Sequence, residues 1–472
     1  MLRTEAWPLL LSIAVSLAGC ASYSGIHGEA HTLAPQSLAF DQNPAGGDWP
    51  RADWWTAFGD AKLDALVRQA LQGNPSLRAA EARVRAVGAL ADATRSSLYP
   101  TLDLEAGATR QRLSRNDIYP PPFGGSWVNQ GRIALDFNYE FDFWGKHRAE
   151  LEGALGDARA ASADAAQARL VLSAAVAQTY FQTQTDLAAL AVARQTLASR
   201  EGLVELNRVR ASRGLEAAIA VRQSDQQIAS SRVEVSAAEA AVQLDRHQLA
   251  ALLGMGPDAA LEVEPALRAY AEVVALPANL PADLLARRPD IAAQRWRLEA
   301  AAARIGAAKA DFFPNVNLAA FAGLGATSLH GLDLLSAGSA VASAGPALHL
   351  PIFDAGRLRA SLRGRYGEYD AAVEQYNQTL VDALRQVADQ VASVRAVQQQ
   401  LADQASALAA AEDAYRLTVD RYRAGLTSYL DVLVNEERLL AERVNRVRLQ
   451  GRSLALAIGT IRTLGGGYHL ES

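Results

Sequence analysis

The chain has 472 residues, a formal net charge of −5 and a single cysteine. This length is enough for two or more ordinary domains, and the near balance of charge gives no indication of a polyanionic partner such as nucleic acid. One cysteine excludes a framework of disulfides within the chain.

The first 19 residues have the features of a secretory signal, which is removed and takes no part in the fold. Arg3 precedes an apolar run, and the segment ends in the motif Leu17-Ala18-Gly19-Cys20. This motif resembles the bacterial lipoprotein box, in which the cysteine becomes the lipidated first residue. The resemblance implies a palmitate-bearing Cys20, and Ala21 after it favours the outer membrane. The alternative is an ordinary signal peptide whose removal leaves a free thiol.

Residues 20–60 are rich in Gly, Pro and small polar residues and are expected to form an extended arm. We expect the tryptophans of this arm to pack in a core: Trp49, Trp54 and Trp55. A helix is predicted from Lys62 to Leu98, with an interruption near Gly73-Asn74-Pro75.

Two segments near 101–113 and 128–143 alternate apolar and polar residues with the period of a strand. One face of each strand is apolar and the other is acidic, which is typical of a sheet that is wet on one side. The acids of the wet face are Asp103, Glu105, Asp136, Glu140 and Asp142.

Each strand has about the length that crosses a membrane, roughly 9–11 residues, and the second carries aromatic residues on its apolar face, as lipid-facing strands do. Four strands cannot close a barrel of membrane size, and an open sheet edge is not tolerated in lipid. If the strands span a membrane, several chains must therefore share one barrel. The alternative is a soluble sandwich that buries the apolar face.

Two equally long segments without proline, Gly145–Gly214 and Gly356–Gly425, follow the strand pairs. At about 1.5 Å per residue, each can extend for roughly 100 Å as a helix, far beyond the size of an ordinary domain. Recurrent apolar positions among charged residues suit coiled-coil packing. Because another helix follows each closing glycine, we predict two helical hairpins with tips at Gly214 and Gly425. Outside the signal, no apolar run is long enough for a transmembrane helix.

The chain contains the same pattern twice. Pro75 and Pro100 of the first copy recur as Pro289 and Pro314 at a constant offset. In the second copy a helix is expected to open after Pro281, with Asp283 as its N-cap, and the tail from residue 465 is expected to be flexible. The predicted segments are a signal peptide at 1–19, a lipidated arm at 20–60, a first repeat at 61–253 with strands near 101–113 and 128–143, a linker at 254–282, a second repeat at 283–464 with strands near 314–326 and 341–353, and a tail at 465–472.

Two stretches of the second copy resemble the outer membrane factor family, the TolC-like exit ducts of tripartite efflux pumps. They are LPADLLARRPDI…RIGAAKADFFPNVNL, from Leu280 to Leu318, and the segment around the second tip, from Arg421 to Leu433. The match is closest to the lipoprotein branch that works with resistance-nodulation-division pumps. It implies a mixed α and β membrane protein, in which three chains form one twelve-stranded outer-membrane β-barrel. The hairpins would form a periplasmic α-barrel, with the arm, linker and tail in an equatorial belt.

The resemblance also implies a gate at the helix tips. By their position from the tip glycine, three residues match gate residues of family members: Tyr422, Leu430 and Asp431. Ser428 and Asp431 also form a capping pattern at the start of the returning helix, and this second role is compatible with the first. Val434 and Ala220 stand where further aspartates would complete a ring, so the gate is expected to be mostly apolar.

No catalytic constellation is present, because the chain lacks a zincin motif, nucleophile elbow, phosphate loop and dinucleotide fingerprint. We therefore expect no enzymatic activity, no cofactor and no metal site. Arg287-Arg288 and the arginines of 208–213 are interpreted as solvated helix faces or cap charges rather than nucleic-acid patches.

The resulting hypothesis is an outer-membrane duct of a Gram-negative bacterium that passively exports drugs or other small toxic solutes from the periplasm. Its implied partners are two further copies of itself, a periplasmic adaptor at the helix tips, an inner-membrane proton-driven transporter and outer-membrane lipid. If the acidic strand face lines the pore, the pore should favour cations. The alternatives are the channel of a type I protein secretion system and a coiled-coil lipoprotein without a pore.

Overall fold

The computed structural model describes residues 22–33, 48–116, 118, 122–259, 263–264, 287–326 and 333–469. These residues form two compact units, each assembled from segments that are far apart in the sequence. The first unit contains Val84–Ala161, Gln294–Tyr376 and the described residues before Leu33, and the second contains the remaining described residues. The predicted signal peptide, Cys20 and most of the linker lie outside the described residues.

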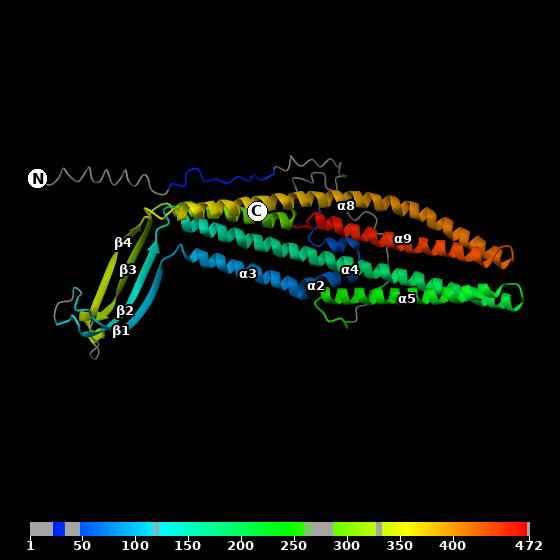
Figure 1. The fold of residues 1–472 in the computed structure, drawn as a ribbon, viewed down its shortest axis with the longest axis horizontal. Coiled ribbons are helices and arrows are strands. Elements are labelled where there is room, and N and C mark those ends of the chain that lie inside the picture. The colour runs from blue at the N-terminus through cyan, green and yellow to red at the C-terminus, as the bar shows by residue number, and fades with distance from the viewer. Residues whose placement is uncertain are drawn as a thin grey trace. The chain divides into compact units, whose positions relative to one another are not determined.

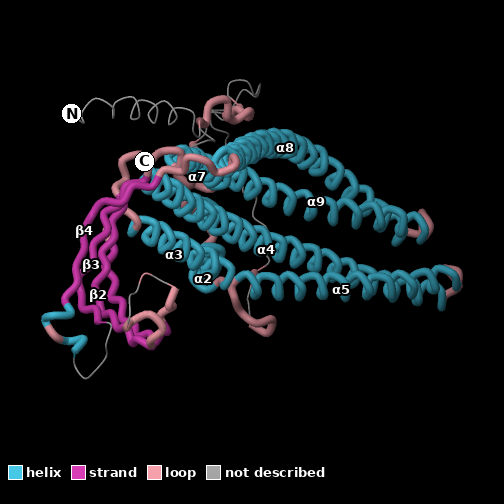
Figure 2. Tube along the Cα trace, turned by 60° about the vertical axis from the view of Figure 1, so that its left-hand side comes forward, coloured by secondary structure: helices cyan, strands magenta, loops and turns pink. Residues whose placement is uncertain are grey.

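A four-stranded antiparallel sheet, with its strands in chain order, belongs to the first unit (Figures 1 and 2). Its strands are β1 (Thr101–Arg112), β2 (Trp127–Glu140), β3 (Asn315–Ala326) and β4 (Ala340–His349). Two short 3-10 helices precede β4, η3 (Asp333–Leu335) and η4 (Ala337–Ser339). Within the chain, β1 and β4 are the edge strands of this sheet.

The register gathers side chains of one kind on each face of the sheet. One row across the four strands is apolar: Leu104, Leu135, Ala322 and Ala342. The neighbouring row, on the other face, contains Asp103, Asp136, Phe321 and Ser343. Since residues paired in register share a face, the alternation in the sequence gives the whole sheet one apolar and one polar face.

The strand ends differ from the prediction in two places. β2 ends at Glu140, so Asp142 is not a strand residue. β4 ends at His349, before Pro351, rather than at residue 353. Pro346 lies in β4, which is an edge strand of the sheet within this chain, and proline within sheets is found mainly on such strands.

A proline marks the start of a helix in both copies. α2 (Ala61–Gly73) ends just before Asn74, and α3 (Pro75–Ser96) starts at Pro75. α7 (Pro289–Ala310) likewise starts at Pro289, and the expected helix start after Pro281, with Asp283 as its N-cap, lies outside the described residues. Proline suits this place because its fixed φ matches the helix and the first turn does not use the missing N–H.

The hairpins are built from four helices: α4 (Lys146–Ser212), α5 (Ala218–Leu252), α8 (Arg357–Arg423) and α9 (Tyr429–Thr463) (Figure 1). The tip glycines Gly214 and Gly425 have φ values of 74° and 77°. Glycine adopts this left-handed conformation without the steric cost of a side chain, which allows the same turn to close both hairpins. Among the helices that the structure describes, none is both long enough and apolar enough to cross a membrane.

The tryptophan-rich end of the arm packs into the core of the second unit. Trp54, Trp55 and Phe58 form the 3-10 helix η2 (Trp54–Phe58) and are buried in one cluster with Phe181 of α4. The rings of Phe58 and Phe181 lie 5.1 Å apart. The predicted core role is therefore confirmed for Trp54 and Trp55, whose large apolar surfaces hold the arm against the helices.

The glycines of the C-terminal tail are tightly packed, so the prediction of a flexible tail is wrong for the tail residues that are described. Gly465, Gly466 and Gly467 all have positive φ. A Cβ atom on Gly465 would overlap the carbonyl of Arg287, and one on Gly467 would overlap the backbone of Arg51. We call this place the glycine junction: Gly465–Gly467 with Arg51, Arg287 and Arg288. The buried Arg288 donates to the Thr463 carbonyl at 3.1 Å, which holds the junction to the end of α9.

The first described residues of the arm are bound to helices of the first unit. The ring of Tyr23 packs edge-on against Phe312, with centroids 5.5 Å apart. The carboxylate of Asp370 on α8 accepts the backbone amides of Glu29 at 3.1 Å and Ala30 at 3.2 Å. These contacts hold residues 23–30 of the arm against Phe312 and α8.

Candidate functional site

The two hairpins share an apolar cluster close to their tips, within the second unit. Its buried members come from all four hairpin helices: Leu203, Ala220, Val419, Tyr422, Tyr429, Val432 and Leu433. We call this group the tip cluster. Because both hairpins contribute to it, they pack as a pair at this end rather than as independent arms.

Tyr422 is completely buried in the tip cluster. Its hydroxyl oxygen lies 2.6 Å from Asn207 Oδ1 and 2.9 Å from Glu216 Oε2, both in the other hairpin. The guanidinium of Arg210 lies over its ring, 4.7 Å from the centroid. Burial and the Glu216 carboxylate raise the pKa of Tyr422, so the hydroxyl keeps its proton and acts as a donor.

A buried ion pair provides a second link between the hairpins. Arg200 on α4 and Glu436 on α9 are 4% and 5% exposed, and Arg200 Nε lies 3.0 Å from Glu436 Oε2. Arg200 also donates to Ser231 Oγ on α5 at 2.8 Å. Burial raises the pKa of Glu436, although Arg200 acts against that shift. A pair of this kind fixes geometry, because loss of either partner leaves an unpaired buried charge.

Asp431 caps α9. It forms a capping box with Ser428, in which the Ser428 amide donates to Asp431 Oδ2 at 3.1 Å and the Ser428 side chain accepts from the Asp431 amide. The hydroxyls of Thr427 and Ser428 lower the pKa of Asp431. The cap role expected from the sequence is confirmed. At the matching position of the first copy, Ala217 provides no side-chain cap for α5.

The structure therefore places the three predicted gate residues in different surroundings. Tyr422 is inside the tip cluster, Asp431 is at the exposed start of α9, and Leu430 is 60% exposed. Val434 is also exposed and lies four residues after Leu430. Residues spaced by four share a helix face, so Leu430 and Val434 form an exposed apolar strip beside the tip. The gate role of these residues remains a prediction.

Sequence reasoning missed the partners of Tyr422. The interpretation of the arginines at 208–213 as solvated helix faces or cap charges holds for Arg208, which is exposed, and for Arg210, which lies in the last turn of α4. The sequence did not indicate that Arg210 also covers the ring of Tyr422. A signal for Asn207 was present, because it follows the buried Leu203 by four residues and so lies on an apolar helix face. An amide at such a position must find a hydrogen-bond partner inside the protein.

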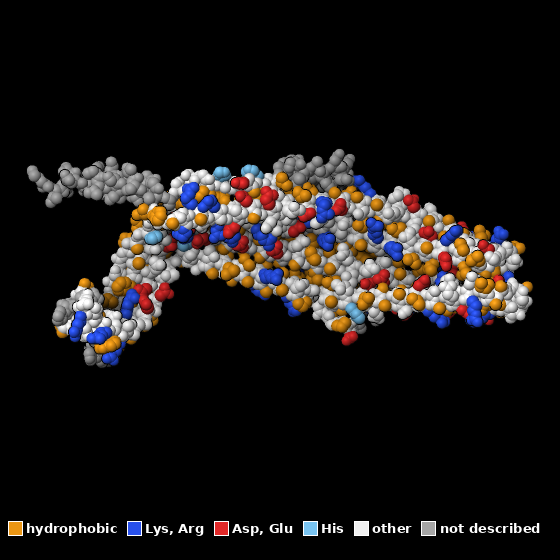
Figure 3. All heavy atoms as spheres, viewed as in Figure 1, with side chains coloured by type: hydrophobic (Ala, Val, Ile, Leu, Met, Phe, Trp, Pro, Cys, Tyr) orange, Lys and Arg blue, Asp and Glu red, His pale blue; other side chains and the backbone are white. Residues whose placement is uncertain are grey.

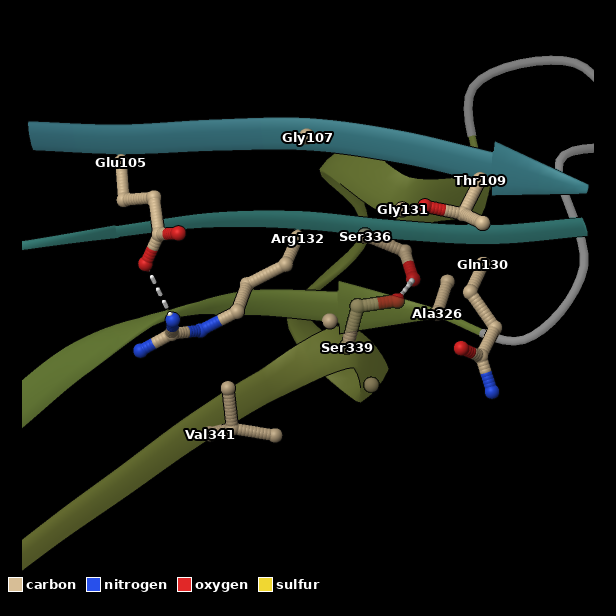
Figure 4. A pocket seen from close by; sticks show the side chains of 12 residues that line it. Glu105, Gly107, Thr109, Gln130, Gly131, Arg132, Ala326, Ser336, Ser339 and Val341 are labelled. Atoms are coloured by element: carbon tan, nitrogen blue, oxygen red, sulfur yellow. Dashed lines mark hydrogen bonds and ion pairs between the residues drawn. The ribbon is translucent and has the colours of Figure 1, made fainter.

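The predicted strand acids lie together on the polar face of the sheet, with one exception described below: Asp103, Glu105, Asp136 and Glu140. An arginine that the sequence analysis did not single out lies among them. Arg132 donates to Glu105 at 2.6 Å (Figure 4) and to Asp136 at 2.7 Å. Around it, Thr109, Gln130 and neighbouring residues line an open hollow of about 810 Å³.

The exception is Asp142, which lies after the end of β2. Its carboxylate accepts the backbone amides of His147 at 3.2 Å and Arg148 at 3.0 Å, at the start of α4. The assignment of Asp142 to the wet strand face is therefore wrong. It is a helix-capping residue, since a short carboxylate before a helix accepts the amides that have no intrahelical partner.

The charge pattern gives no indication of a metal or polyanion site. In the part of the chain that the structure describes, no group of three or more His, Cys, Asp or Glu side chains is arranged to hold a metal ion. On the face drawn in Figure 3, acidic and basic side chains are interspersed along the helices. Such mixed surfaces are typical of solvated helix faces.

Comparison with known proteins identifies the family. Residues 66–255 and 280–466 match the family model described as outer membrane efflux protein. The chain belongs to this family. Among curated members, the multidrug resistance outer membrane protein MdtP of Escherichia coli is 30% identical, over 97% of this chain and 96% of its own length. The toluene efflux pump outer membrane protein TtgF of Pseudomonas putida is 34% identical, over 98% and 96%.

Solved structures support the same assignment. The outer membrane protein VceC of Vibrio cholerae superposes with a TM-score of 0.82 at 38% identity, covering 89% of this chain and all of that chain. The outer-membrane channel OprN superposes with a TM-score of 0.82 at 30% identity, covering 94% and 97%. This outer membrane efflux protein therefore has the mixed α and β fold of outer-membrane channels. The predicted family and the predicted outer-membrane location are confirmed.

Proposed function

We propose that three copies of this chain form the exit duct of a tripartite efflux pump. The duct passively conducts drugs or other small toxic solutes out of the periplasm, together with a periplasmic adaptor and an inner-membrane proton-driven transporter of the resistance-nodulation-division class. The names of similar proteins support this cargo class, since they are multidrug resistance and toluene efflux proteins. A fusaric acid resistance protein of Burkholderia cepacia, 36% identical over 75% of this chain and 68% of its own length, has a name of the same kind.

The observation that carries the proposal is a sheet with one apolar face, one polar face and two open edges. An open strand edge has unpaired N–H and C=O groups, which lipid cannot satisfy. Pairing β1 of one copy with β4 of the next removes every edge once the ring closes, and three copies give a twelve-stranded barrel. The apolar face then meets lipid and the polar face lines the pore. A tether without a pore would have no use for the polar face.

The anchor belongs to the same proposal. Residues 1–19 act as a signal peptide, and Cys20 is lipidated in the outer membrane. The contacts of Tyr23 with Phe312, and of Glu29 and Ala30 with Asp370, then hold the lipidated end of the arm close to the unit that contains the sheet. Acyl chains anchor the protein without spanning the bilayer.

The helix tips form the gate and the adaptor site. Both tips expose apolar residues at equivalent positions: Leu215 and Ile219 in the first copy, and Leu426 and Leu430 in the second. Exposed apolar groups at a fixed place indicate a protein contact, and the adaptor is the partner that reaches this end of the duct. To open the tip, the hairpins must separate, which breaks the bonds of Tyr422 to Asn207 and Glu216.

The deciding experiment is native mass spectrometry of the mature protein purified in detergent. We expect a trimer whose chain mass corresponds to an acylated protein that starts at Cys20. Replacement of Cys20 by Ala should remove the acyl mass and leave the trimer intact. A monomer that stays soluble without detergent would contradict the shared barrel, and the long hairpins would then belong to a scaffold.

A further inference from the structure

Arg132 lies in β2 on the polar face of the sheet, and its side chain contacts residues of three strands. From β2 it donates to Glu105 on β1 at 2.6 Å and to Asp136 on its own strand at 2.7 Å. Its guanidinium lies over the ring of Phe321 on β3, 5.0 Å from the centroid. Figure 4 shows the side chain of Arg132 directed toward Glu105 along the polar face.

Arg132 offsets part of the negative charge of this face. Among the strand residues that the structure describes, four carboxylates lie on the polar face, and Arg132 is the one lysine or arginine on it. Two of the four carboxylates are its ion-pair partners. The guanidinium stays charged at any working pH. The acids alone would make this face strongly negative, and Arg132 offsets one of their charges between Glu105 and Asp136, which lie diagonally across neighbouring strands.

Phe321 explains how the guanidinium is held in place. It is the one phenylalanine on the polar face within the described strands, where an apolar ring has no lipid or core to contact. A planar guanidinium stacks on such a ring and still presents its N–H groups sideways to two carboxylates. A lysine in the same place would keep the charge but would lack the fork that bridges two acids.

We propose that Arg132 sets the ion selectivity of the pore. This inference rests on the proposed function, because it requires the polar face to line a water-filled barrel. Charged side chains in a narrow passage with low-dielectric walls raise the local concentration of the opposite ion. With Arg132 paired to Glu105 and Asp136, the pore discriminates less between cations and anions than its acids alone predict. Such a duct accepts solutes of either charge, which suits a conduit whose cargo is chosen elsewhere.

The test is the reversal potential of the reconstituted lipidated protein in a planar bilayer under a KCl gradient. It is best made at low salt, where the screening length is about 10 Å at 0.1 M. Arg132→Gln should raise the cation-to-anion permeability ratio roughly twofold. Arg132→Lys should keep a ratio close to that of the native protein. The matched control is Arg110→Gln, which removes the same charge from the opposite face, where Arg110 lies over Trp127; its ratio should not change.

A second variant keeps the test informative if Arg132→Gln fails to assemble. Glu105→Gln combined with Asp136→Asn leaves Arg132 unpaired, and the ratio should move toward anions. An unchanged ratio in a conducting Arg132→Gln or double variant would overturn the inference and leave the channel intact. Absence of any conductance in the native protein would instead overturn the proposed function.

Discussion

The hydroxyl of Tyr422 connects two hairpins through atoms that are hidden from water. Its partner Asn207 also donates to Ser224 Oγ at 2.7 Å, so one amide joins α8 to both helices of the other hairpin. Inside a protein, such linked hydrogen bonds are costly to leave half made, because the remaining polar groups stay buried without a partner. The hydroxyl of Tyr422 therefore links the hairpins in addition to the apolar packing of the tip cluster and the Arg200–Glu436 ion pair.

Replacing Tyr422 by Phe should weaken the closed tip. The ring still fills the tip cluster, but Asn207 and Glu216 lose the hydroxyl whose single proton they share, at a cost of about 1–3 kcal/mol for leaving the buried Asn207 without this partner. We expect a severalfold higher single-channel conductance or open fraction in planar bilayers. Tyr415→Phe is the control, because that hydroxyl has only a long contact with Ser199, at 3.4 Å. Equal conductance of the two variants would show that the Tyr422 hydroxyl does not hold the tip closed.

The local contacts of residues in this region can be predicted from the sequence, but their contacts with distant parts of the chain cannot. The cap formed by Ser428 and Asp431 was predictable because capping is a local pattern over four residues. The bond from Tyr422 to Asn207 was not, since it joins positions far apart in the chain and depends on how two hairpins pack. The pairing of Arg132 with Glu105 was hidden for the same reason, because strand register decides which charges meet.

At the level of elements, the sheet assigns different environments to adjacent residues. Leu104 and Asp103 are neighbours in β1, and they lie on the apolar and the polar face respectively. The period of two made the faces predictable from sequence. The strand ends were less predictable. β2 stops before Asp142, whose carboxylate instead accepts amides of α4. The alternating pattern in the sequence continues through Asp142, and only the tertiary structure shows that this residue caps a helix.

The assignment of β1 residues to the apolar and polar faces of the sheet is tested by a pair of arginine substitutions. Leu104→Arg puts a charge on the apolar face, which the proposed barrel turns toward lipid, at a cost of about 2–4 kcal/mol near the middle of a bilayer. Asp103→Arg puts the same side chain on the wet side and should be tolerated. We expect Leu104→Arg, and not Asp103→Arg, to reduce the amount of assembled trimer in outer membranes, as measured by unheated gel electrophoresis. Equal loss in both variants would contradict the assignment of faces.

The two returning helices should differ in the stability of their first turns. Ser428 and Asp431 cap α9, whereas α5 begins at Ala218 after an alanine without a side-chain acceptor. We expect amide hydrogens in the first turn of α5 to exchange with deuterium faster than those of α9. Ser428→Ala should remove the difference.

The difference in exchange rate between the first turns of α5 and α9 should also depend on pH. The pKa of Asp431 is lowered from its ordinary value of 3.8 in the folded protein. Its contribution to the cap is therefore fully present above pH 3.8 and is lost as the pH falls through the lower folded pKa. If the hydrogen-exchange rate of the amides in the first turn of α9 did not change when Asp431 becomes protonated, this cap would be contradicted.

For the molecule as a whole, the glycine junction brings together segments from three parts of the sequence. The end of the arm, the start of the second repeat and the C-terminal tail meet at atoms that leave no room for a side chain. The repeat in the sequence made the order of elements predictable, including both hairpins. The glycine junction was not predictable, because a run of glycines indicates a flexible tail unless the surrounding backbone is known.

Two glycine-to-alanine substitutions should therefore have opposite effects on the thermal stability of the protein. Gly467→Ala meets the backbone of Arg51 and forces a positive φ on alanine, which should cost more than about 1 kcal/mol. Gly202→Ala lies in α4 with open space around it and should stabilise the helix by about 0.5–1 kcal/mol. Thermal unfolding in detergent, followed by circular dichroism, should show a lower midpoint for the first variant only. A Gly467→Ala variant as stable as the native protein would mean that the junction is loose.

The unequal caps of the two hairpins affect the symmetry of any closed assembly. When identical chains form a ring, hairpins of the first and second repeat follow each other around it, so a tip ended by Ser428 always has neighbours ended by Ala217. The pattern of capped and uncapped tips around the rim, which is the ring of hairpin tips, repeats once per chain and not once per hairpin. A ligand that touches successive tips meets two surfaces in strict alternation, so duplication of the sequence has not doubled the rotational symmetry of the rim.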